Sequence, residues 1–332
     1  VSKPRRPRGL LPRAAVALLA LLVAPLLRQP SVVLAQETPP TPTVTLSVTA
    51  TDKKGRVVRD LKREDFRVFE EGAEQKITHF SKDESPISYG LVVDNSGSLK
   101  NLLPVVVATG KAFVGDNRAG DETFIVRFAA SDSIHVTQDF TPDKAALKES
   151  LDAMYVEGGQ TAVIDALYLS ADKLSKHERG GPPGRRALIL LSDGEDRDSH
   201  YRLEDLLKLL RRSDVPVFCV GFVGMLDDEH GFIRPSRREQ ATALLKRLAA
   251  ETGGQAYFPK NNAELQDAFN EVQLHLRERH AIGYTPAPVA GAKARRKVEV
   301  KVVEAPGRGK LQAVALPRFV GPKSEGDARR ND

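Results

Sequence analysis

The stretch LVVDNSGSL, residues 91–99, carries the pattern that decides the fold of this chain. Its first three residues are apolar, which is typical of a strand buried on both faces, and Asp94 stands where that strand would end. Two hydroxyl side chains, Ser96 and Ser98, follow at alternate positions. Asp, Asn, Ser and Gly also favour turns, so an ordinary turn is one interpretation. The other is that three oxygen ligands are directed at one hard cation.

Apolar strand patterns of the same kind recur along the chain, in ISYGLVVD, ETFIVRFA, RALILLSD, VPVFCVGF and GQAYFP. Between them, apolar residues at helical spacing predict helices at 102–116, 142–154, 162–176, 203–212, 237–251 and 263–279. Strands that alternate with helices and are apolar on both faces are typical of a mostly parallel sheet covered by helices. We therefore expect an α/β fold over residues 87–280, with a doubly wound, Rossmann-like, mostly parallel sheet.

Residues before and after this part alternate between apolar and polar, which predicts antiparallel strands. TVTLSVTATD and the pair FRVFEEG and QKITHF, two strands around a Gly-containing turn, come before it, and AIGYTP, KVEVKVV and LQAVAL come after it. Neither set of strands buries enough surface to be stable alone. We expect residues 44–86 and 281–320 to pair in one small antiparallel β-sandwich, into which the α/β domain is inserted.

The first 35 residues have the layout of a secretory signal peptide. They contain six basic side chains and no acid, which accounts for the whole net charge of +6 of the chain. A 14-residue apolar run at 14–27 follows the basic start, and Val33-Leu34-Ala35 precedes Gln36 as a cleavage site. The alternative, an uncleaved membrane anchor, needs about 20 unbroken apolar residues, and Pro25 and Arg28 interrupt the run.

We therefore expect an exported protein, periplasmic or extracellular, without stable membrane insertion after cleavage. A Pro/Thr-rich linker at 36–43 and a polar, disordered tail at 321–332 complete the predicted organisation. The single cysteine, Cys219, lies in an apolar strand pattern, so it cannot form an internal disulfide and is expected in the core. The basic run KARRK, at 293–297, has no interleaved aromatic residues, which argues against nucleic-acid binding.

Known catalytic patterns are absent from the sequence. The seven histidines show no H-E-x-x-H spacing, and no G-x-x-x-x-G-K-[ST] phosphate loop occurs. Ser192 lacks the preceding glycine of a G-x-S-x-G nucleophile elbow. In haloacid dehalogenase-like phosphotransferases an acid stands two residues after the strand Asp, but here that position is Ser96, which cannot act as a general acid near neutral pH. We expect no enzyme activity.

Three separate loops are predicted to bring oxygen side chains to one edge of the sheet, because ligands bind beyond the carboxyl ends of parallel strands. Asp94 follows one strand, Asp193 follows RALILL, and Thr161 opens a helix after two glycines. Two carboxylates offset the charge of a divalent ion, while Ser96, Ser98 and Thr161 coordinate it without adding charge. Such a donor set suits Mg²⁺ or Mn²⁺ and leaves one coordination position for the carboxylate of a partner protein.

DNSGS at 94–98, the threonine of GGQT at 158–161 and Asp193 in LSDGED together resemble the metal-ion-dependent adhesion site (MIDAS) of von Willebrand factor A domains. The resemblance implies that Ser96, Ser98 and Thr161 make direct or water-linked metal contacts, and that Asp94 and Asp193 act largely through water. The flanking segments are similar to those of exported A-domain proteins of acidobacteria, although AVALPRFVG at 313–321 departs from their final strand.

The leading hypothesis is an exported, non-catalytic adhesion module that binds an acidic group of a partner through the metal. An envelope-assembly scaffold with a purely structural metal and a metal-dependent hydrolase are the alternatives. Three further features have two interpretations each. Asp165 is a support for the site or a plain helix acid, Asp196 and Asp198 add outer charge or lie in solvent, and the insert at 224–239 shapes partner choice or is merely tolerated.

Overall fold

The computed structural model describes residues 44–180, 184–226, 235–286, 296–303, 309, 311–314 and 319–320. The predicted signal peptide (1–35), linker (36–43) and tail (321–332) lie outside the described residues, as do the middle of the insert (227–234) and most of the KARRK run. Among the described helices, none has the length and apolar character needed to cross a membrane.

A six-stranded sheet lies at the centre of the α/β part, in the order β10-β9-β8-β5-β6-β7. Its strands are β5 (Ile87–Asp94), β6 (Glu122–Phe128), β7 (Ile134–Thr141), β8 (Arg185–Ser192), β9 (Val217–Gly221) and β10 (Ala256–Tyr257). All pairs are parallel except β6 with β7. The predicted α/β class with a mostly parallel sheet is confirmed. The edge strand β7 was not predicted, because its residues are half-exposed or exposed and show no apolar run.

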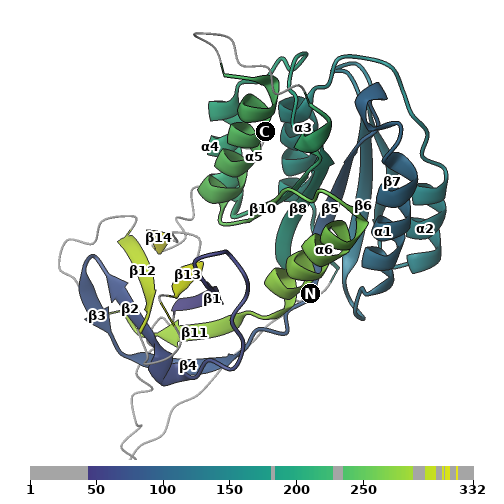
Figure 1. Ribbon diagram of the computed structural model, residues 1–332. Helices are drawn as coiled ribbons and strands as arrows, with labels where there is room; N and C mark the ends of the chain where they lie inside the picture. Colours follow the sequence, from purple (N-terminus) through teal and green to yellow (C-terminus); the bar gives the residue numbers. More distant parts are fainter. Residues whose placement is uncertain are drawn as a thin grey trace, which may run out of the picture. The chain divides into compact units, whose positions relative to one another are not determined.

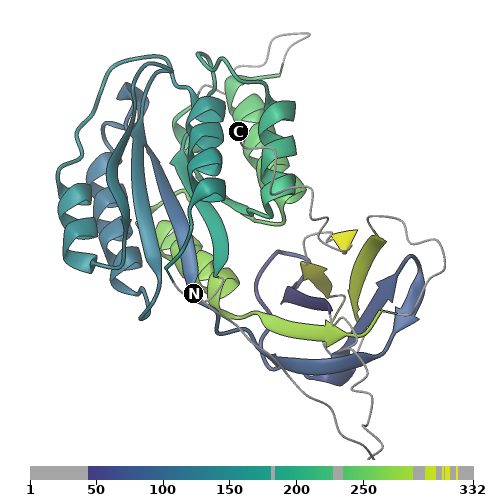
Figure 2. The same cartoon turned by 180° about the vertical axis from the view of Figure 1, so that it is seen from behind.

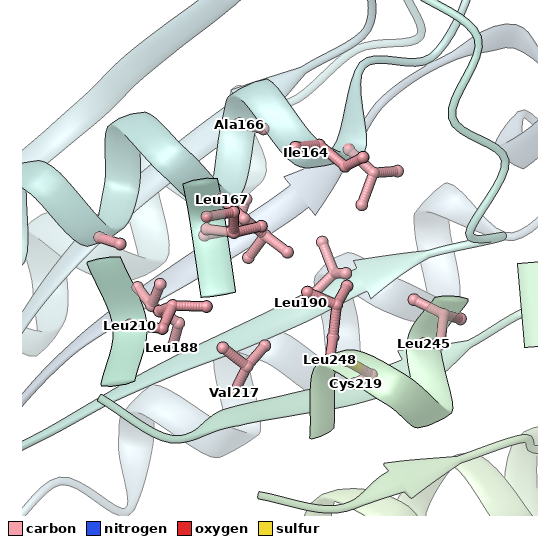
Figure 3. Packing of buried hydrophobic residues seen from close by; sticks show 14 of the residues in the cluster. Ile164, Ala166, Leu167, Leu188, Leu190, Leu210, Val217, Cys219, Leu245 and Leu248 are labelled. Atoms are coloured by element: carbon pink, nitrogen blue, oxygen red, sulfur yellow. The ribbon is translucent and has the colours of Figure 1, made fainter. Parts of the chain in front are cut away.

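Helices cover both faces of this sheet (Figure 1; Figure 2 gives the view from behind). One face carries α1 (Leu103–Gly115), α2 (Lys144–Asp152) and α6 (Asn262–Arg277), and the other carries α3 (Val163–Lys176), α4 (Leu203–Ser213) and α5 (Arg237–Thr252). Both ends of each of these six helices lie within two residues of the predicted positions. Figure 3 shows the second face, where Leu188 and Leu190 of β8 pack against helix residues such as Leu210 and Leu248, and where the buried Cys219 lies.

Side chains at the helix starts explain why several boundaries were predictable. Asp143 accepts hydrogen bonds from the amides of Ala145 and Ala146 and so begins α2. Ser236 and Glu239 form a reciprocal capping box at the start of α5. Such caps satisfy backbone amides that have no partner inside the helix, so they leave a signal in the local sequence.

Strands from before and after the α/β part pair with one another in two antiparallel sheets, as expected. One sheet has the order β13-β1-β11-β4 and the other β14-β12-β2-β3. The strands of the first are β1 (Val44–Thr51), β4 (Ile77–Lys82), β11 (His280–Tyr284) and β13 (Gln312–Val314). Those of the second are β2 (Phe66–Glu70), β3 (Ala73–Gln75), β12 (Arg296–Val302) and β14 (Phe319–Val320). Apolar residues of both sheets form one core, which includes Leu46, Val68 and Ile282.

The predicted Gly-containing turn between FRVFEEG and QKITHF forms, but the two segments do not make the hairpin that the sequence suggests. Strand β2 pairs with the short β3 around a turn at Glu71 and Gly72, both of which have positive φ. Strand β4 leaves that hairpin and pairs with β11 in the other sheet. Phe66 of β2 and Ile77 of β4 are buried in the same core from different sheets. The alternation of apolar residues reports that a strand has a buried face, but not which strand is its neighbour.

Helix α6 carries a buried histidine with a testable effect on stability. His275 is 2% exposed, and its Nε2 lies 3.0 Å from the carbonyl oxygen of Gly55, to which it donates. Burial lowers the pKa of His275 from 6.5 to about 4, although this hydrogen bond acts in the opposite direction. The neutral imidazole therefore contributes stability that is present above the unfolded pKa and is lost as pH falls through the window between these two values.

We expect the free energy of unfolding to fall by about 2 kcal/mol from this group between about pH 7 and pH 5. Urea unfolding at about pH 7 and about pH 5 gives the free energy of unfolding of the wild type and of His275→Gln at each pH. The contribution of His275 is the part of the fall between the two pH values that occurs in the wild type but not in the variant. The same pH dependence in both proteins would show that His275 does not titrate as its burial requires.

Candidate metal centre

The first loop of the site follows β5. Asp94 is fully buried at the end of this strand. Its Oδ1 accepts a hydrogen bond of 2.9 Å from the amide of Ser96, and its Oδ2 accepts one of 2.7 Å from the hydroxyl of Ser192. A 3-10 turn, η2 (Gly97–Leu99), follows, and the hydroxyl oxygens of Ser96 and Ser98 lie 3.0 Å apart. The structure thus brings three of the predicted residues together on one loop.

The second loop follows β8, the parallel neighbour of β5, so both loops leave the same edge of the sheet. Asp193 is fully buried, and its Oδ1 accepts a hydrogen bond of 3.0 Å from the amide of Glu195. Its Oδ2 is buried and has no hydrogen-bond partner among the described residues. The hydroxyl of Ser192 links the loops, because it donates to Asp94 and accepts a bond of 2.9 Å from the amide of Gly194.

The third loop contains Thr161, which is 6% exposed. The carbonyl of Thr161 accepts hydrogen bonds from the amides of Arg197 (2.8 Å) and Asp198 (3.3 Å) in the loop after Asp193. The next amide, that of Ala162, donates to the carbonyl of Ala129 just after β6. The backbone of the third loop is therefore fastened to the second loop and to the end of a neighbouring strand.

The acids around the site hold loops in place. Asp165 of α3 accepts hydrogen bonds from the amides of His200 (3.0 Å) and Tyr201 (2.8 Å), so it holds the loop before α4, while a role in supporting the metal centre stays a prediction. Asp196 accepts bonds from the amide of Ile164 (3.1 Å) and from a serine hydroxyl in its own loop. Asp198 accepts bonds from the amide and hydroxyl of Ser131, at 2.9 and 2.7 Å. Asp196 and Asp198 are therefore hydrogen-bonded to neighbouring segments and are also partly exposed to solvent.

Sequence reasoning also missed a polar cluster beside Asp94. The side-chain amide of Asn95 donates to the carbonyl of Tyr155, and the carbonyl of Asn95 accepts from the amide of Glu157. The carboxylate of Glu157 pairs with Arg127 and accepts a bond of 2.6 Å from Ser133, and this bond is the main reason that its pKa is lowered. Only the fold brings these residues together, and no local spacing in the sequence indicates them.

The electrostatics of the site are those of two buried, like charges. Burial raises the pKa of Asp94 to about 7, and the negative charge of Asp193 acts in the same direction. Burial also raises the pKa of Asp193, while the hydroxyl of Ser98 acts in the opposite direction. No described Lys, Arg or His forms an ion pair with either acid. A divalent cation would supply the missing positive charge.

The donor set fits a small, hard cation that takes oxygen ligands. The unpartnered Oδ2 of Asp193 is a buried acceptor of the kind that a metal or its bound water satisfies. Across the described ranges, no three His, Cys, Asp or Glu side chains gather as a metal-binding cluster. That the hydroxyl groups of Ser96, Ser98 and Thr161 are ligands stays a prediction.

Comparisons with known proteins identify the fold of this region. The model of the von Willebrand factor type A domain family matches residues 90–271, more than half of the chain. No curated protein sequence matches.

Several solved structures resemble the chain at low identity. An aerotolerance-related membrane protein from Bacteroides fragilis is 18% identical, with 56% of this chain and 98% of that chain covered and a TM-score of 0.42. A von Willebrand factor type A protein from Catenulispora acidiphila is 14% identical, with 84% and 75% covered and a TM-score of 0.45. The vWF domain of the type V pili tip protein Mfa5 from Porphyromonas gingivalis is 14% identical, with 63% and 99% covered and a TM-score of 0.44.

Proposed function

Because the chain belongs to the von Willebrand factor type A domain family, we propose that it is a non-catalytic interaction module that binds an acidic group of a partner protein through a divalent cation. One observation carries this proposal. Two buried carboxylates, Asp94 and Asp193, lie beyond neighbouring strands, and Asp193 keeps an unpartnered oxygen. Such a pair is unfavourable without a positive charge, so the site is built for a cation.

Asp94, Ser96, Ser98, Thr161 and Asp193 would hold the metal, which is Mg²⁺ or Mn²⁺. The three hydroxyl residues coordinate directly or through water, and the two acids act largely through water. The metal supplies a positive charge that attracts a carboxylate of the partner. The serines and the threonine add no charge, so the centre keeps enough positive character to bind an acid. The intact adhesion site and kinship with exported acidobacterial A-domain proteins belong to the same proposal.

The organisation of the chain is part of the proposal. Residues 87–280 form the A domain, and residues 44–86 and 281–320 form a β-sandwich into which it is inserted. Residues 1–35 direct export to the periplasm or beyond the cell. Exposure to the envelope suits reversible adhesion or assembly with a protein partner, because one charge-assisted contact concentrates the binding energy.

The proposal is tested by capturing envelope proteins on the immobilised chain in MgCl₂ and in EDTA. We expect one or more partners to be retained in MgCl₂ and released by EDTA, and Asp94→Ala to retain none while its circular dichroism stays that of the wild type. Equal recovery with and without chelator would refute metal-mediated binding. If Mg²⁺ raises the melting temperature but no binding depends on it, the metal is purely structural, as in a scaffold.

Ser192 provides a more local prediction. Its hydroxyl joins Asp94 to the loop of Asp193, so Ser192→Ala should weaken Mg²⁺ affinity about tenfold to a hundredfold while leaving the fold intact. Isothermal titration calorimetry with MgCl₂ measures this affinity. Ser170→Ala, which also removes a buried hydroxyl but lies on α3, is the matched control and should bind Mg²⁺ as the wild type does. Unchanged affinity in Ser192→Ala would remove Ser192 from the site.

A further inference from the structure

The sheet edge that carries the candidate metal centre also carries an apolar pocket of about 530 Å³. This volume is in the range of pockets that bind ligands. Met225, at its mouth, lies on the 3-10 turn η3 (Val223–Met225) and is 53% exposed. An isolated exposed apolar residue is common and by itself indicates nothing, but this one contributes to the lining of the pocket. The apolar side chains that line the pocket are those of Leu102, Phe222, Val223, Met225, Phe258, Pro259 and Leu265, and Asn261 and Asn262 are among its polar residues.

The pocket lies close to the loops of the candidate metal centre, although it contains none of the five proposed metal ligands. Leu102 comes four residues after Ser98, and its amide donates a hydrogen bond of 2.9 Å to the carbonyl of Leu99 at the end of η2. On the other side, the amide of Phe222 donates a bond of 2.9 Å to the carbonyl of Ser192, whose hydroxyl reaches Asp94. The loop that carries Asp94, Ser96 and Ser98 therefore leads into one wall of the pocket, and a second wall, after β9, is hydrogen-bonded to the residue before Asp193.

The η3 wall of the pocket is held in place. The guanidinium of Arg238, at the start of α5, donates to the carbonyls of Val223 (3.2 Å), Gly224 (3.4 Å) and Leu226 (2.8 Å). A preformed wall lowers the ordering cost of binding. Arg238 and the exposed Lys260 also line the pocket, so its rim carries positive charge. A rim of this sign complements an acidic chain.

We propose that this pocket receives a large apolar side chain, such as Phe, Leu or Met, from the same acidic partner segment whose carboxylate binds the metal. This inference rests on the proposed function and specifies the chemistry of the partner. A carboxylate alone is present on nearly every protein surface, so it gives little discrimination. An apolar side chain at a fixed spacing from the acid supplies the specificity, because both contacts form only when one segment presents both groups.

The test uses fluorescein-labelled peptides of Gly and Ser that contain one Glu and one Phe, with the Phe moved stepwise along either side of the Glu. Matched peptides replace the Phe by Ser or the Glu by Gln. Binding is measured by fluorescence anisotropy in excess MgCl₂ and in EDTA. We expect the Phe to tighten binding about tenfold or more at one spacing, because a buried phenyl group is worth at least that factor. EDTA or the Gln peptide should abolish binding.

Two variants act on the pocket without touching the buried core. Met225→Ser removes an exposed apolar side chain from the pocket wall. We expect the increase in peptide affinity that Phe gives over Ser to become about threefold or more smaller. Gly224 lines the pocket, and a Cβ built on it would have no atom within 4 Å, so Gly224→Trp should fold. We expect its indole ring to occupy the pocket, so that Phe no longer increases peptide affinity. Leu169→Ser is the matched control, because Leu169 is another exposed apolar residue, 43% exposed on α3, and should leave the increase from Phe unchanged.

The outcomes separate this inference from the proposed function. If the Glu peptides bind in a Mg²⁺-dependent way but Phe adds nothing at any spacing, the pocket proposal is wrong and the metal proposal stands. If no peptide binds in MgCl₂, both are wrong. If Phe still increases peptide affinity in EDTA, the pocket binds independently of the metal, which also overturns the inference. So would Mg²⁺-independent dimerisation that Met225→Ser abolishes, because the pocket would then hold a second copy of the chain.

Discussion

Replacing Asp193 by asparagine will abolish the response of this protein to Mg²⁺ and, at the same time, make the metal-free protein more stable. The two effects have one cause. Asp94 and Asp193 are both fully buried, and the charge of Asp193 raises the pKa of Asp94. Removing one charge relieves the repulsion in the absence of metal, but it also removes the charge balance that a divalent cation needs.

Urea unfolding at about pH 8, above the pKa of about 7 of Asp94, measures both effects. For the wild type we expect Mg²⁺ at a hundredfold excess over its dissociation constant to add about 2.7 kcal/mol to the free energy of unfolding. For Asp193→Asn we expect no added stability in MgCl₂ and about 1 kcal/mol more stability than the wild type in EDTA. Asp132→Asn, which removes an exposed acid, is the matched control and should change neither value.

An Asp193→Asn protein that is still stabilised by Mg²⁺ would show that this acid is not needed for metal binding. A variant that is less stable than the wild type in EDTA would show that the two carboxylates do not oppose one another in the folded protein. Either result would remove the main support for a cation site at this edge.

Replacing Gly254 by alanine will destabilise the protein by about 3 kcal/mol. A Cβ at Gly254 would lie 1.9 Å from the carbonyl oxygen of Val217 in β9, and backbone cannot move aside as a side chain can. The amide of Gly254 also donates a hydrogen bond to the carbonyl of Ala249 near the end of α5. Moving residue 254 away from β9 would therefore also displace the end of this helix. The glycine is needed for close approach of helix and strand.

Thermal or urea unfolding checks this expectation. Gly158→Ala is the matched control, because a Cβ at Gly158 meets no atom within 4 Å, and it should change the free energy of unfolding by less than about 0.5 kcal/mol. Similar stability of the two variants would mean that α5 and β9 can separate without cost.

The helices of the α/β part were predictable because their signals are local. The apolar residues of α3, such as Val163, Ala166 and Leu174, recur at helical spacing, and caps such as Ser236 mark where helices begin. Strand β7 has no comparable signal, since it lies at an edge and none of its residues is fully buried. The prediction that β2 pairs with β4 failed for a related reason. The sequence of each strand indicates which face is buried but not which strand lies beside it.

The five predicted metal ligands came from short motifs, and the structure places Asp94, Ser96 and Ser98 on one loop, with Asp193 on the next strand end. Their role as ligands remains a prediction. Ser192 was considered only as a nucleophile, and its hydrogen bond to Asp94 became visible only in the fold. Asn95 and Glu157 have no motif at all, because their partners lie on other loops.

The sequence by itself determined the α/β class, the helix positions and the five residues proposed to bind metal, because periodicity, capping and short motifs depend on neighbours along the chain. Only the tertiary structure decided which antiparallel strands pair, how deeply Asp94 and Asp193 are buried, and that an apolar pocket lies close to their loops. Burial and pocket shape depend on contacts between residues far apart in the sequence. No local pattern records those contacts, since they arise when the chain packs.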